Sequence, residues 1–61
     1  MTLTIDTSRL RELGATLAIG YDAWERAWHV SIVRDGHPTI EVADVDAQTA
    51  IDAAMRRLLA P

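Results

Sequence analysis

Apolar and polar residues alternate along two stretches, residues 28–33 and 37–42, on either side of an Asp35-Gly36 pair. Alternation with a period of two is typical of half-buried β-strands, and Asp-Gly often forms the turn between paired strands. A three-residue loop, Arg34-Asp35-Gly36, with Gly36 in the left-handed conformation, brings the apolar residues of both stretches to one face. The pairs that this loop predicts are Trp28 with Val42, Val30 with Ile40, and Ile32 with Pro38.

The opposite face of this predicted hairpin is polar or carries small side chains. It sets His29 opposite Glu41 and Ser31 opposite Thr39, because directly opposed residues point to the same side of a sheet. Pro38 lacks the N–H that a ladder of hydrogen bonds needs, so we expect its strand to lie at a sheet edge.

A third strand is predicted over residues 15–21, where Leu17, Ile19 and Tyr21 alternate with small residues. Leu17 and Tyr21 also continue the apolar stripe of a preceding helix, which leaves one long first helix as the alternative. Two glycines weaken a helix in this region, so we favour the strand. In antiparallel pairing the strand sets Leu17 opposite Ile32, Ile19 opposite Val30, and Tyr21 opposite Trp28.

Apolar residues at helical spacing flank the three predicted strands. Residues 8–13 form a short predicted helix that Asp6 or Thr7 caps and a glycine ends. Asp46 is a favourable N-cap for a second helix over residues 47–60, whose apolar side chains should cover the sheet. Those side chains are Ala50, Ile51, Ala54, Met55 and Leu58, whereas Gln48, Asp52 and Arg56 are expected to point outward.

The predicted fold is therefore α+β: a helix, a three-stranded antiparallel meander and a second helix (αβββα), with both helices on one face of the sheet. We expect residues 1–61 to form a single domain, residues 2–5 to fray, and Trp28 to lie in the core. A core of this size stabilises a domain by only about 3–5 kcal/mol.

The chain has nine acidic residues, six arginines, no lysine and no cysteine, and a formal net charge of −3. Residues 35–55 hold five of the acids and no Lys or Arg, which argues against direct binding of a nucleic-acid backbone. The lack of cysteine excludes disulfides and thiolate metal sites. The sequence contains no recognisable signal peptide or membrane-spanning stretch, so we expect a cytoplasmic protein with no membrane partner.

A meander brings acidic residues from distant parts of the sequence toward one end of the sheet, where the first loop approaches the end of the third strand. One hypothesis is a partner-binding patch anchored by Trp24, since tryptophan dominates many interfaces. The alternative is that Asp46 caps its helix, Asp22 supports the turn and the other acids are solvated charges. Burial and exposure of Trp24 are both left open. The six residues of this patch are Asp22, Trp24, Glu25, Glu41, Asp44 and Asp46.

Two other chemistries have weaker support in the sequence. Asp44 and Asp46 with Glu41 offer oxygen ligands for a hard cation, but the further ligands and the glycine of an EF-hand loop are lacking. His29 opposite Glu41, with Ser31 on the same face, could form an acid–base couple, but a flat open face gives no pocket that excludes water. The sequence therefore predicts no metal, no cofactor and no catalytic residue.

Three resemblances bear on function. The order of elements resembles the double-stranded-RNA-binding domain, but residues 46–49, Asp-Ala-Gln-Thr, stand where that family's final helix begins with a basic cluster. Residues 28–54, from Trp28-His29-Val30 to Asp52-Ala53-Ala54, resemble HicB-type antitoxins, small domains that neutralise a partner toxin. In size, acidity, lack of cysteine and lack of any enzyme motif, the whole chain is similar to the small anti-CRISPR inhibitors carried by phages and mobile elements.

The anti-CRISPR resemblance implies a protein that binds an effector subunit, often as a DNA mimic that blocks access to the target or its flanking recognition sequence. With the acidic patch, it leads us to expect a small protein-binding inhibitor rather than an enzyme. Its expected partner is a protein with a basic nucleic-acid-binding surface, such as a type I CRISPR effector complex. The inhibitor is expected to be a monomer or a weak homodimer. The alternative is a HicB-like antitoxin or a small homo-oligomeric assembly module that uses its open sheet face or edge.

Overall fold

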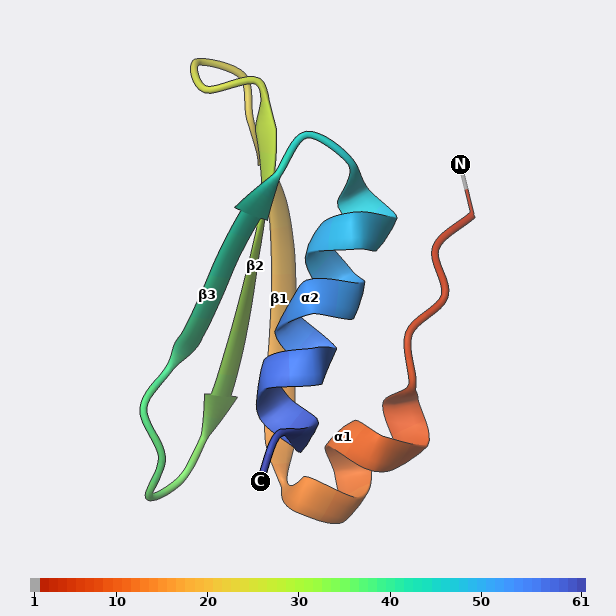
Figure 1. Cartoon of the computed structure of the whole chain (residues 1–61), viewed down its shortest axis with the longest axis vertical. Helices are drawn as coiled ribbons and strands as arrows, with labels where there is room; N and C mark the ends of the chain where they lie inside the picture. The colour runs from red at the N-terminus through yellow and green to blue at the C-terminus, as the bar shows by residue number, and fades with distance from the viewer. Residues whose placement is uncertain (1) are drawn as a thin grey trace.

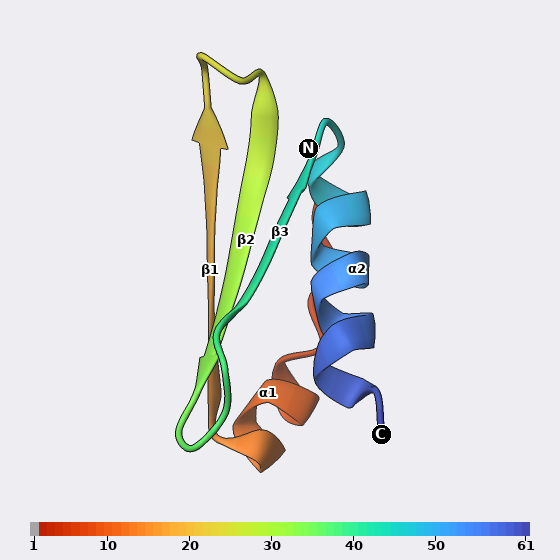
Figure 2. The same cartoon turned by 60° about the vertical axis from the view of Figure 1, so that its left-hand side comes forward.

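The structure, a computed structural model, describes residues 2–61 and confirms the predicted order of helix, meander and helix (Figure 1). The strands form one antiparallel sheet in the order β1-β2-β3, and both helices lie on the same side of it (Figure 2). The elements are α1 (Thr7–Leu13), β1 (Ala15–Asp22), β2 (Ala27–Arg34), β3 (Ile40–Asp44) and α2 (Ala47–Leu59).

The short helix α1 is bounded by the two residues that the sequence suggests. The Asp6 carboxylate accepts a hydrogen bond from the Arg9 backbone N–H at 3.1 Å, which satisfies one free donor of the first turn. Gly14 follows the last turn with a φ of 63°, a left-handed conformation that costs glycine little. Residues 15–22 then form β1, so the alternative of one long first helix is wrong.

The core lies between α2 and the inner face of the sheet. Val30 and Ile32 of β2 and Ile51 of α2 are each at most 1% exposed. Ala50 and Ala54 are fully buried on the same helix face, so their small side chains let α2 approach the sheet closely. Around this centre, partly buried apolar residues complete the core, namely Leu3, Ile5, Ala15, Leu17, Ile19, Trp28, Ile40, Val42 and Leu58.

The predicted register between β1 and β2 is confirmed. Leu17 pairs with Ile32, and Ile19 with Val30. Tyr21 pairs with Trp28, and their rings meet edge to face with centroids 5.1 Å apart at 60°. Such aromatic pairs contribute about 0.5–1.5 kcal/mol beyond their burial.

The predicted register between β2 and β3 is wrong by two residues. Val30 pairs with Val42 and Ile32 with Ile40, while Trp28 pairs with Asp44. The connection is longer than three residues: a turn joins Arg34 to His37, and Pro38 and Thr39 follow it outside the ladder. Gly36 does adopt a positive φ, of 76°. The strand β3 lies at a sheet edge, as predicted, but Pro38 precedes it.

This shift changes the pairs on the open face of the sheet. His29 pairs with Ala43 instead of Glu41, and Ser31 pairs with Glu41 instead of Thr39. Because the shift is two residues, every side chain keeps its predicted face, so the apolar layer beneath α2 is preserved.

The N-terminal segment is attached to α2 instead of frayed. The Thr4 backbone N–H donates to Gln48 Oε1 at 2.8 Å, and Gln48 Nε2 donates to the Thr4 carbonyl at 2.9 Å. Leu3 and Ile5, on either side of Thr4, pack against the core. The expectation that Gln48 points outward is therefore wrong, since its half-buried side chain binds this segment.

Candidate functional site

The turn between β1 and β2, residues 23–26, extends beyond the ends of β3 and α2 (Figure 1). Asp22, the last residue of β1, holds its backbone. One carboxylate oxygen of Asp22 accepts hydrogen bonds from the N–H groups of Trp24 at 2.9 Å and Glu25 at 3.2 Å. Arg26 ends the turn with a φ of 55°, an uncommon conformation for a residue with a side chain. Trp24 and Glu25 therefore project from a backbone that Asp22 fixes.

Trp24 is 97% exposed, which answers the question that the sequence leaves open. Trp28, four residues later, is half-buried against Tyr21 and the edge of the core, in line with its predicted place. Burying a tryptophan is worth several kcal/mol in small cores, so an exposed one contributes nothing of this kind to folding. Trp24 is the most exposed of the large apolar side chains in the part of the chain that the structure describes.

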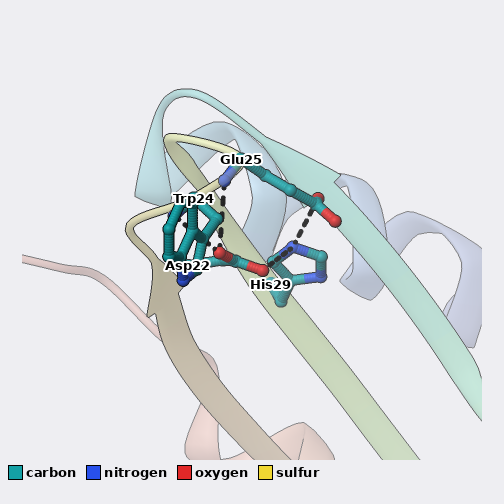
Figure 3. Close-up of polar contacts among 4 residues, drawn as sticks. All are labelled: Asp22, Trp24, Glu25 and His29. Carbon is teal, nitrogen blue, oxygen red and sulfur yellow. Dashed lines mark hydrogen bonds and ion pairs between the residues drawn. The ribbon is translucent and has the colours of Figure 1, made fainter.

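His29 joins Asp22 and Glu25 at the base of the turn (Figure 3). Its Nε2 lies 3.1 Å from a Glu25 carboxylate oxygen and 4.0 Å from the free oxygen of Asp22. The side chains of all three residues are partly exposed, from 37% for Asp22 to 61% for Glu25. Solvent screens these polar contacts, and the hydrogen bond between His29 and Glu25 links the turn to β2.

The same three side chains are a possible set of metal ligands. One imidazole nitrogen and two carboxylate oxygens, all within 4.8 Å of one another, match the donors that Zn²⁺ accepts. Water would have to complete the coordination, since the group is open to solvent. The sequence predicts no metal site, and the weakly supported set of oxygen ligands considered there, Asp44, Asp46 and Glu41, is not the set that the structure brings together.

Asp44 and Asp46, at the end of β3, are engaged with nearby backbone. An Asp44 carboxylate oxygen accepts from the Asp46 N–H at 2.9 Å. Asp46 caps α2, since one oxygen accepts from the Thr49 N–H at 2.9 Å and from the Thr49 hydroxyl at 2.8 Å. These bonds to Thr49 lower the pKa of Asp46 below its ordinary value. The predicted structural roles of Asp22 and Asp46 are thus both observed.

Glu41 lies apart from the other five residues of the predicted patch. It sits near the start of β3, opposite Ser31, while the turn is at the far end of the strands. Its side chain is on the open face and lines a shallow hollow with His29, Ser31 and Ala43. Its backbone carbonyl accepts a hydrogen bond from Arg57 at 3.1 Å. The acidic end of the molecule therefore consists of Asp22, Glu25, Asp44 and Asp46, with Arg26 among them.

The opposite end of the sheet carries charges of both signs. An open hollow of about 680 Å³ lies there between the β2–β3 loop and the last turn of α2. Arg34, Arg57, His37 and Glu41 line it together with apolar residues such as Pro38 and Leu58. The Trp24 end thus has four acids and one arginine, whereas at the other end Arg34 and Arg57 lie with Asp35 and Glu41.

His29 is the residue of this site that sequence reasoning missed. The predicted register set His29 opposite Glu41, which directed attention to the middle of the open face. The spacing Asp22, Glu25 and His29 across a four-residue turn is the signal that could have revealed the group, because pairing Gly20 with His29 puts His29 diagonally next to Asp22.

Comparison of the chain with protein-family models, with curated proteins and with solved structures finds no match. Within residues 2–61, no helix has both the length and the apolar character needed to cross a membrane.

Proposed function

We propose that this chain is a protein-binding inhibitor that uses the turn at residues 23–26 as its contact. Trp24 is the anchor, and the neighbouring carboxylates select a partner with a cationic surface. The observation that carries the proposal is the 97% exposure of Trp24 on a turn that Asp22 holds in place.

The physical basis is a low cost of binding. A tryptophan buries a large area when it enters a partner's pocket, and little backbone freedom is lost because the turn is already ordered. Glu25, whose carboxylate points toward His29 (Figure 3), and Asp22 add negative charge to the base of the turn, which speeds encounter with a cationic surface and disfavours acidic partners. A basic groove that normally holds nucleic acid offers such a surface, and occupying it would block the nucleic acid.

The narrower form of this proposal is an anti-CRISPR inhibitor that blocks target DNA on a type I effector complex. It draws on the resemblance in size, acidity and lack of cysteine and adds no residue to the site. In this form the protein acts as a partial DNA mimic through Asp22, Glu25, Asp44 and Asp46.

The test measures binding of the purified chain to a guide-loaded type I effector complex, and its competition with target DNA. We expect Trp24→Ala to weaken binding by about tenfold or more, as for a typical hot spot. Glu25→Lys should weaken it in a salt-dependent manner. Asp35→Lys is the matched control, because it makes the same charge change on an exposed residue at the other end of the sheet.

Equal binding by wild type, Trp24→Ala and Glu25→Lys would contradict the proposed contact. If the effector complex does not bind at all, the narrower form is wrong. The broader form is then tested by affinity capture from a bacterial lysate, where a captured nucleic-acid-binding protein should be lost with Trp24→Ala and retained with Asp35→Lys.

A second candidate function, an assembly or antitoxin-like module, is supported by a different feature. Within residues 2–61, no helix lies over one face of the sheet, and the edge strand β1 carries no charge from Ala15 to Tyr21 (Figure 2). This feature concerns the edge of the sheet and does not involve Trp24.

A further inference from the structure

The two edge strands of the sheet differ in how they are protected from pairing with another chain. β3 has five residues, follows Pro38, and carries Glu41 and Asp44. Short length, proline and charge are the usual means by which proteins block an exposed edge. β1 has eight residues, with no charge before Asp22 and no proline. Among the described residues, no segment lies beyond β1 in the plane of the sheet (Figure 2).

The inner face of β1 is also less well covered than that of β2. Val30 and Ile32 of β2 are at most 1% exposed, whereas Tyr21 of β1 is 54% exposed. Leu17 and Ile19 are only half-buried, because α2 lies over β2 and β3, whereas the short helix α1 makes fewer contacts with β1. Both the backbone edge and the apolar side chains of β1 therefore remain open to a further strand.

We propose that β1 pairs antiparallel with β1 of a second copy of this chain, which joins the two sheets into one of six strands. A two-fold axis perpendicular to the sheet relates the copies, so their helices lie on the same side. The new strand pair satisfies the free backbone groups of both edges and extends the cover over Leu17, Ile19 and Tyr21.

Charge complementarity is the reason for choosing a second copy. The end of β1 leads to Asp22, Glu25 and Arg26, which have a formal net charge of −1. Its start adjoins Arg9, Arg11 and Glu12 of α1 and lies beside Arg34 and Asp35, which together have a formal net charge of +1. Antiparallel pairing sets the acidic end of each copy beside the cationic end of the other. Parallel pairing would bring like charges together, so the antiparallel arrangement is favoured.

The side-chain pattern limits the register of the dimer. Opposed residues of an antiparallel pair point to the same side of the sheet. One residue of β1 must therefore lie directly opposite the same residue of the second copy, with the two-fold axis midway between them. Near the middle of β1 the choices are Ala18 and Ile19. With Ala18 on the axis, Thr16 lies opposite Gly20, and these exposed, small side chains meet without obstruction.

The proposal goes beyond the inhibitor function and does not depend on it. Neither Trp24 nor the turn takes part in the strand pair, so the dimer presents two Trp24 side chains at opposite ends. Two contacts on one particle would strengthen attachment to a partner with repeated sites. Dimerisation and partner binding are measured separately, so either can fail while the other holds.

The test is the oligomeric state of the full chain by sedimentation equilibrium over a concentration series. We expect wild type to be a dimer that dissociates on dilution. Ala18→Lys should raise the dissociation constant by about tenfold or more, because it sets two cations beside the axis. Ala43→Lys is the matched control, an exposed alanine on the same face but on β3, and should dimerise like wild type. Circular dichroism checks that both variants are folded.

Salt gives a second measurement that does not rely on a variant. Raising NaCl from 50 to 500 mM should weaken the dimer, because it screens the attraction between opposite ends. A wild-type chain that stays monomeric at millimolar concentration would overturn the proposal. So would equal dimerisation of Ala18→Lys and Ala43→Lys, or a dimer that only Ala43→Lys disrupts.

Discussion

The helix-covered part of the sheet and the turn at residues 23–26 use their large side chains in opposite ways. Between α2 and the sheet, Val30, Ile32 and Ile51 are at most 1% exposed, whereas Trp24 in the turn is 97% exposed. Apolar burial stabilises the first region, while hydrogen bonds to Asp22 order the second. Fold stability and the proposed partner contact therefore rest on different residues, and each can be altered without the other.

The largest effect is expected from truncation in the helix-covered region. Ile51→Ala removes a fully buried side chain and should cost about 2–5 kcal/mol of the free energy of unfolding. That loss is comparable to the whole stability of a domain of this size, about 3–5 kcal/mol. We expect a largely unfolded chain at 25 °C by circular dichroism. Val45→Ala, at a residue 79% exposed, is the control, and a folded Ile51→Ala with an unchanged urea midpoint would refute this picture.

An intermediate effect on stability is expected from Asp46, the N-cap of α2. Hydrogen bonds from Thr49 lower the pKa of Asp46 in the folded state, so its charged form stabilises the fold above the unfolded pKa of about 4. That contribution is lost as pH falls through the lowered pKa. Asp46→Asn keeps a capping oxygen without a titrating group.

Urea midpoints at pH 7 and pH 2.5 test this effect of Asp46. The wild type should lose more stability than Asp46→Asn over that interval, and a parallel loss in both proteins would exclude Asp46 as the source. Asp6→Asn makes the same substitution at the N-cap of α1, and its urea midpoints at the two pH values serve as a comparison.

The smallest effect on stability is expected at Trp24. Trp24→Ala should change the free energy of unfolding by less than about 0.5 kcal/mol, because the side chain has almost no contacts to lose. Urea unfolding followed by circular dichroism measures it. A loss above 1 kcal/mol would mean that the indole packs on the protein.

The sequence predicts the fold well where the alternation of apolar residues and the turn together allow only one pairing register. Leu17, Ile19 and Tyr21 find their partners because the Asp22–Ala27 pair closes a tight turn that leaves no room for a shift. For β3 a shift of two residues preserves every face, so apolar pattern alone cannot distinguish Ile32 opposite Pro38 from Ile32 opposite Ile40. The length of the connection, residues 35–39, determines the register, and the alternation of apolar residues does not specify that length.

The two registers also explain why the sequence predicts only part of the candidate site. Asp22, Trp24 and Glu25 are neighbours in sequence, so any turn brings them together. The observed register of β3 places Glu41 farther from them than the predicted register does, and His29 lies beside Asp22 and Glu25 instead. The exposure of Trp24 could not be predicted because it depends on how far the turn extends beyond α2, and side-chain pattern does not fix that distance.

The link between Thr4 and Gln48 has a consequence for the order of folding. Its two hydrogen bonds join residues 44 positions apart, while the meander consists of strands that neighbour one another in sequence. Closing such a long loop costs more chain entropy than forming either hairpin, so the meander and α2 can assemble first and the N-terminal segment docks last. By the same logic, this segment is the first to detach in the native state, and its amide at Thr4 should exchange with solvent hydrogen sooner than those of β2.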